Sequence, residues 1–149
     1  PMTLTVREIE LVQTSFRHIE PISGLAGELF FARLFAEDAQ MQALFKGEMA
    51  VEGQQLMEVL TTLVHGLTDW EGVVPVARDL AGRLVAQGMT PAMYGPIGEA
   101  LIFTLAQSLD EAFDVETRAA WEAAYAQVSE AMVTSAYAKA APSKTVAAE

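Results

Sequence analysis

The sequence predicts an all-α protein built as one domain. Apolar residues recur at helical spacing along most of the 149-residue chain, and no stretch alternates as a half-buried strand would. Hydrophobic residues make up 52% of the chain, which is enough for a core of its own. We therefore expect a helical sandwich of about six to eight helices over residues 1–138, followed by a frayed tail over residues 139–149.

Three helical segments are expected in the N-terminal part. Thr5 and Glu8 have the spacing of a capping box, so a helix should begin after Thr5 and end in the break at 21–24. A second helix is expected over residues 25–35 and a short helical turn over 39–45. The residues expected to face the core are Val6, Ile9, Val12, Phe16, Ile19, Leu25, Leu29, Ala32, Phe35, Met41 and Leu44.

The remaining sequence predicts the longer helices. One helix should end near Leu67, and Thr68–Asp69 is placed to cap the next one, which Gly88 should end. Thr90–Pro91 has the pattern of a helix start, and Asp114 is placed to cap the last long helix. The expected core positions are Leu56, Leu60, Leu63 and Leu67, then Val73, Ala77, Leu80 and Leu84, then Tyr94, Ile97, Leu101 and Leu105, and finally Trp121, Ala124, Val128 and Met132.

Composition excludes several classes of function. The formal net charge is −11, so nucleic acid and anionic membrane surfaces are not expected partners, because both require clustered basic residues. The chain has no cysteine, which removes disulfides and thiolate metal sites. Neither a signal peptide nor a membrane-spanning segment is visible, so a cytoplasmic location is expected.

Nothing in the sequence predicts an enzyme or a metal centre. There is no glycine-rich phosphate loop, nucleophile elbow or paired-histidine helix. The only imidazoles are those of His18 and His65. Both lie off the apolar faces of their segments and are expected at the surface.

Four segments carry a resemblance to a known family. They are FFARLFAEDAQMQALF, EGQQLMEVLTTLVHGLTDWEGVVP, TPAMYGPIGEALIFTL and AAWEAAYAQVSEAM. In this order and spacing they resemble the single-domain bacterial haemoglobins of the Vitreoscilla type and the globin module of flavohaemoglobins. The likeness runs from Val6 to about Tyr137 and implies a globin fold, with haem and oxygen binding as the family's usual role.

The family's haem-site positions carry over to this chain one at a time. The resemblance places the proximal histidine position at Leu84, and the glutamate that supports that histidine at Ala136. On the distal side, the tyrosine position is Phe31 and the glutamine position falls on or beside Glu52. Only Tyr94 keeps the family's residue, and its hydroxyl is expected to bind a backbone group rather than iron.

These replacements predict a degenerate haem site. A leucine cannot coordinate iron, so we expect a protein without haem that senses or carries a small apolar or amphipathic ligand, or that binds a protein partner. The alternative is a haem protein with atypical iron ligation that binds oxygen or nitric oxide. The oligomeric state is open, and a dimer is compatible with the family. The former haem pocket is expected to comprise Phe31, Phe45, Glu52, Met57, Leu84 and Tyr94.

An unfilled haem site would be a large and costly void. We therefore expect bulky side chains to close it, leaving a collapsed or much-reduced pocket. On that expectation, Leu84→His alone would not produce a stable haem protein, because the site would lack space as well as a ligand.

Overall fold

The computed structural model describes residues 3–45 and 49–137, and of residues 49–52 it describes the backbone alone. All regular structure in these ranges is helical, as predicted, and none of the helices there is long and apolar enough to cross a membrane. The predicted tail over 139–149 lies outside the described residues. The helices are α1 (Val6–Ile19), α2 (Ser23–Glu37), α3 (Met41–Leu44), α4 (Met49–His65), α5 (Trp70–Ala86), α6 (Tyr94–Leu109) and α7 (Val115–Tyr137), joined in part by 3₁₀ turns at Glu20–Ile22, Gly66–Thr68, Pro91–Met93 and Asp110–Ala112.

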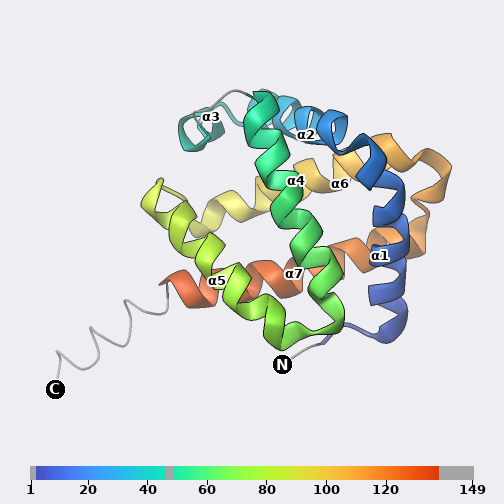
Figure 1. Ribbon diagram of the computed structural model, residues 1–149. Coiled ribbons are helices and arrows are strands. Elements are labelled where there is room, and N and C mark those ends of the chain that lie inside the picture. Colours follow the sequence, from blue (N-terminus) through green and yellow to red (C-terminus); the bar gives the residue numbers. More distant parts are fainter. Residues whose placement is uncertain (1–2, 46–48, 138–149) are drawn as a thin grey trace, which may run out of the picture.

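The helices form two crossed layers around a core. The closest helix pairs are α2 with α4, α2 with α6, α1 with α7, and α5 with α7. Figure 1 shows α4 passing in front of α6 and α7, so the long helices cross rather than run parallel as in a simple bundle. Two clusters of buried apolar residues fill the interior, and each takes members from α2, α4, α6 and α7.

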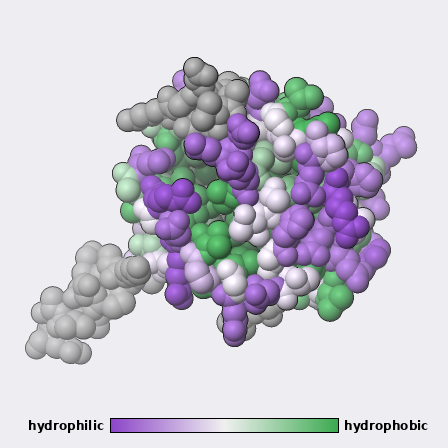
Figure 2. Space-filling model, viewed as in Figure 1, coloured by the Kyte–Doolittle hydropathy of each residue, from purple (hydrophilic) through white to green (hydrophobic). Residues whose placement is uncertain are grey.

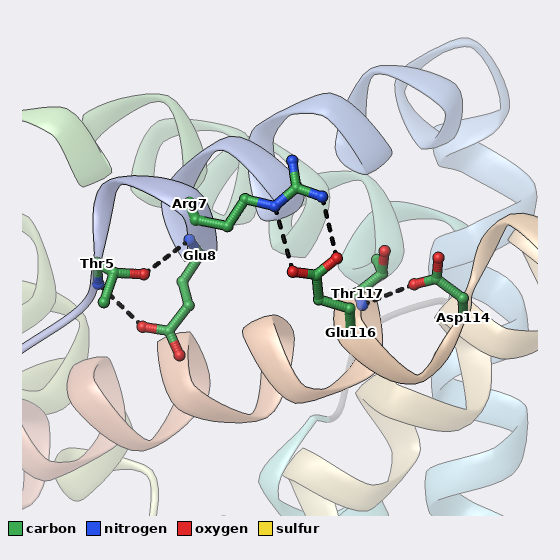
Figure 3. A network of polar contacts seen from close by, with 6 residues as sticks. All are labelled: Thr5, Arg7, Glu8, Asp114, Glu116 and Thr117. Atoms are coloured by element: carbon green, nitrogen blue, oxygen red, sulfur yellow. Dashed lines mark hydrogen bonds and ion pairs between the residues drawn. The ribbon is translucent and has the colours of Figure 1, made fainter.

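Side-chain caps fix the N-terminal ends of α1 and α7, which lie next to each other. The Thr5 hydroxyl accepts from the Glu8 amide at 3.0 Å, and the Glu8 carboxylate accepts from the Thr5 amide at 2.9 Å, which confirms the predicted capping box (Figure 3). Asp114 caps α7 by accepting from the amide three residues later at 2.8 Å. Arg7 donates to both carboxylate oxygens of Glu116 and so joins the two capped ends.

Both ends of α5 lie where the sequence predicts them, whereas α6 starts later than predicted. Asp69 caps α5, and Gly88, with a φ of +107°, follows its end in the left-handed region that favours glycine. Thr90 is extended, but its side chain makes no capping hydrogen bond. A 3₁₀ turn begins at Pro91, and α6 starts only at Tyr94.

The predicted core faces of α1 and α2 need correction. Leu25 is 70% exposed and Ala32 is also exposed, because the buried side of the helix lies nearly opposite to the predicted one. Apolar residues are so frequent in α2 that the hydropathy pattern alone does not show which side of the helix is buried. Val6 is 74% exposed because it lies in the first turn of α1. The observed inner face of α2 comprises Ala26, Gly27, Phe30, Phe31 and Leu34.

Two glycines set the close approach of α2 and α4. A Cβ added at Gly27 would lie 2.8 Å from the backbone oxygen of Gly53 and 2.9 Å from its Cα. These atoms belong to the backbone, so they cannot move aside as a flexible side chain could. The crossing that positions α4 over the interior therefore requires glycine at position 27.

We expect Gly27→Ala to lower the free energy of unfolding by about 1–3 kcal/mol, because overpacking against backbone exceeds the gain in helix propensity. Gly82 is the matched control, since it lies within α5 and a Cβ there would meet nothing within 4 Å. Gly82→Ala should raise the free energy of unfolding by about 0.5–1 kcal/mol. Denaturant unfolding measures both. Equal stabilisation by the two substitutions would contradict the close approach.

Candidate ligand-binding cavity

A cavity of about 250 Å³ lies in the interior between α2, α4, α5, α6 and α7. For comparison, an engineered cavity of about 150 Å³ lined by apolar side chains stays dry and binds benzene. The space here is therefore large enough for a small organic molecule. Most of its wall is apolar and includes Phe30, Phe31, Phe45, Leu56, Leu60, Leu63, Leu80, Leu84, Met89, Ile97, Leu101, Trp121 and Met132.

The expectation that bulky side chains close this space is wrong. The aromatic rings of Phe30, Phe31 and Phe45 line the cavity and contact one another without filling it. The Phe31 ring lies 5.0 Å from that of Phe30, 5.5 Å from that of Phe35 and 5.0 Å from that of Phe45, measured between centroids. The rings therefore pack against one another as part of the wall, and the cavity of about 250 Å³ remains open beside them.

Four of the six predicted site residues come together here, since Phe31, Phe45, Leu84 and Tyr94 all line the cavity. Met57 does not line it, which corrects its predicted place in the pocket. It packs instead in the core cluster that contains Phe16 and Ile19. It lies one residue beyond Leu56 on α4 and therefore faces another direction. The side chain of Glu52, the sixth residue, lies outside the described residues.

The cavity has a polar, solvent-exposed end that the sequence analysis missed. Gln55, Arg83 and Gln87 line the cavity and are exposed. In the sequence Arg83 precedes Leu84 and Gln87 lies about one turn further on, but only the approach of α4 shows that these residues border a cavity. Figure 2 shows hydrophobic residues recessed among hydrophilic ones in the region that lies between α4 and α5 in Figure 1.

The opposite end of the cavity is apolar and closed. Val12 from α1, Leu67 from the turn after α4, and Trp121 from α7 line it and are almost fully buried. The indole N–H of Trp121 donates to the Ser15 hydroxyl at 2.8 Å, so it is not free to bind a ligand. The cavity thus runs from an exposed polar opening to a buried apolar end.

Tyr94 lies in the wall with an unsatisfied hydroxyl. The residue is 7% exposed, and its hydroxyl oxygen has no hydrogen-bond partner among the described residues. The expectation of a backbone partner for it is therefore wrong. Its carbonyl, in contrast, accepts from the Tyr125 hydroxyl at 2.6 Å. Ala136, at the position where the resembled family has a carboxylate, offers no acceptor.

Burial keeps this phenol protonated. Burial, with a smaller contribution from the negative charge that Tyr137 would carry, raises the pKa of Tyr94 to about 12 from an ordinary value of 10.0. Burial also raises the pKa of Tyr125 and that of Tyr137. The Tyr137 hydroxyl donates to the Met89 carbonyl at 2.5 Å, which ties α7 to the loop beside the cavity.

These shifts predict how stability depends on alkaline pH. A pKa that is higher in the folded state gives stability that is fully present below pH 10 and is lost as pH rises toward about 12. We expect tyrosinate absorbance at 295 nm to stay low until helicity is lost, and both to change together above pH 10. Tyr94→Phe should shift this transition to higher pH. Ionisation of all three tyrosines in a still-helical protein would contradict the prediction.

The donor groups at the cavity do not suit iron held by an imidazole. Both histidines are exposed, as predicted, and neither lines the cavity. The His65 ring lies 3.3 Å from the Glu20 carboxylate at the surface. The wall offers the Tyr94 phenol and the thioethers of Met89 and Met132, and Leu84, which also lines it, has no donor atom. Within residues 3–45 and 53–137, no group of three or more His, Asp or Glu side chains could hold a metal ion.

The crossed helices around a central apolar cavity define a class of α-helical ligand-binding protein. A family model for globins matches residues 28–132, so the chain belongs to the globin family. This confirms the resemblance and the predicted fold.

Individual relatives are distant. The chain is 26% identical over 107 residues to a flavohemoprotein from Bordetella parapertussis, in an alignment covering 70% of this chain and 27% of that protein. It thus spans about a quarter of the flavohemoprotein's length. It is 24% identical over 143 residues to a neuroglobin from Tetraodon nigroviridis, covering 87% of this chain and 90% of that one. A hexacoordinated haem protein from an anhydrobiotic tardigrade has the same fold, with a TM-score of 0.82 at 14% identity over 90% of this chain and 96% of that one.

Proposed function

We propose that this globin binds a small apolar or amphipathic molecule in the central cavity instead of haem, and acts as a sensor or carrier. The observation that carries the proposal is an apolar cavity of about 250 Å³ whose wall has no histidine and includes Leu84, the residue that the family resemblance aligns with the proximal histidine. Iron without a protein ligand would be weakly held. An apolar ligand needs only the surface that the wall already provides.

The energetics of the cavity favour a ligand. At about 24 cal/mol per Å³, an enclosed dry cavity of 250 Å³ would correspond to about 6 kcal/mol of lost packing, which is an upper limit here because one end opens to solvent. That is comparable with the whole stability of an ordinary domain, about 5–15 kcal/mol. A molecule that fills the space would recover part of this loss, so binding and stability should be strongly linked.

Binding of a protein partner is less well supported. Among the residues whose side chains the structure describes, the exposed large apolar ones are distributed over four helices and the turn before α2, and they are Val6, Ile22, Leu25, Val85 and Val115. Catalysis also lacks support, because the cavity wall combines apolar side chains with a protonated phenol and offers no paired acid and base.

Absorbance spectroscopy tests the proposal against the haem alternative. The protein is produced with added haem precursor, and its Soret absorbance is compared with its concentration. It is then titrated with an apolar fluorescent probe, and thermal unfolding is followed with and without the probe. We expect no stoichiometric Soret band, saturable probe binding and a higher Tm with probe. A stoichiometric Soret band would establish atypical iron ligation, and absence of any probe binding would also overturn the proposal.

A further inference from the structure

The charge of the cavity opening points to the class of ligand. Arg83 is the only charged residue among the described residues that line the cavity, although the chain as a whole carries a formal charge of −11. A cation at this place selects anions against the background of the acidic surface. Its ion pair with Asp79, at 3.4 Å, lies between two side chains that are mostly exposed, and such pairs are weak enough to exchange for a ligand.

Neutral hydrogen-bond donors accompany this cation. Gln55 from α4 and Gln87 from the end of α5 line the same exposed end of the cavity. A guanidinium group and two side-chain amides supply several N–H donors and suit an oxyanion such as a carboxylate. Because this end is open to solvent, the charged group of a ligand would remain partly hydrated, which avoids the cost of burying a charge.

Away from the opening the wall is mostly apolar, and the Tyr94 hydroxyl is the buried side-chain polar atom there that has no partner among the described residues. Trp121 at the closed end has its N–H bonded to Ser15, and the Tyr125 hydroxyl is bonded to the Tyr94 carbonyl. The surrounding side chains at that end, such as Val12 and Leu67, are aliphatic. A ligand that matches both ends has one anionic group and one apolar chain.

We infer that the cavity binds a monocarboxylate with an aliphatic chain, with the carboxylate at Arg83 and the chain directed toward Trp121. This inference rests on the proposed function and specifies its ligand. It predicts that affinity depends both on the charge of the head group and on chain length until the chain reaches the closed end.

The first test compares octanoate, decanoate and 1-decanol by calorimetric titration. Decanoate should bind about ten-fold more tightly than 1-decanol, and affinity should rise about four-fold for each added methylene. Arg83→Gln should remove the preference for decanoate. Arg118→Gln is the matched control, since Arg118 also pairs with an acidic residue four positions away in an exposed helix, but it does not line the cavity.

The second test measures orientation. In a Trp70→Phe background, Trp121 is the only tryptophan. Decanoate with bromine at its terminal carbon should quench Trp121 fluorescence strongly, and decanoate with bromine beside the carboxylate should quench it little. Equal binding of decanol and decanoate, unchanged binding in Arg83→Gln, or the reverse order of quenching would overturn the inference while leaving the proposed function in place. A stoichiometric Soret band would overturn both.

Discussion

Replacing Leu84 with histidine should turn this globin into one that takes up haem, raising the haem content from a trace to nearly one per chain. Leu84 lines the cavity on α5, so a histidine there would direct an imidazole into open space. The expected failure of this substitution depended on a collapsed pocket, and the cavity of about 250 Å³ removes that reason. Soret absorbance per mole of protein provides the measurement.

The controls separate ligation from polarity. Leu84→Asn places a polar side chain at the same point without an imidazole and should leave haem content at the level of the unmodified protein. Adding Ala136→Glu to Leu84→His should strengthen haem retention further, because a carboxylate that accepts from the ring N–H orients a ligating histidine. If Leu84→His and the double variant both lack haem, the cavity does not admit a porphyrin in the required position.

The fold was largely predictable because its signals are local. The capping box at Thr5, the caps at Asp69 and Asp114, and the glycine at position 88 each act over a few residues and have a physical cause visible in the sequence. The inner face of α2 was not predictable in this way. Its phase depends on the approach of Gly27 to Gly53 on another helix, and glycine contributes almost nothing to a hydropathy pattern.

The cavity illustrates a second limit. The positions of Phe31, Phe45, Leu84 and Tyr94 in its wall followed from the family resemblance. Whether side chains fill the space between them depends on the total packing of several helices, which no local pattern encodes. A volume argument gives the expected cost of a void, but it does not show whether side chains fill the space.

The misplacement of Met57 has a similar cause. Neighbouring residues on a helix point about 100° apart, so Met57 does not line the cavity although Leu56 beside it does. The polar opening at Arg83 was missed for another reason. In the sequence it is one basic residue in an exposed helix, and only the proximity of α4 shows that it borders a cavity.

The packing of α7 leads to a prediction that separates stability from binding. Ala120 and Ala124 are both buried on α7, one turn apart, but only Ala124 lines the cavity. Ala124→Leu should place added methyl and methylene groups into empty space and raise the free energy of unfolding by about 2 kcal/mol. Ala120→Leu should force the same groups into a filled core and lower it by about 1–3 kcal/mol. Denaturant unfolding should therefore show effects of opposite sign for one chemical change.

The same pair distinguishes a functional cavity from a packing defect. If the space exists to hold a ligand, Ala124→Leu should weaken decanoate binding at least ten-fold while it stabilises the free protein, because the new side chain occupies the ligand's volume. A substitution that stabilises the free protein but weakens ligand binding is expected where a destabilising cavity is kept for function. If Ala124→Leu destabilises the protein as much as Ala120→Leu does, then the cavity is already closed in solution, and the proposed ligand site with it.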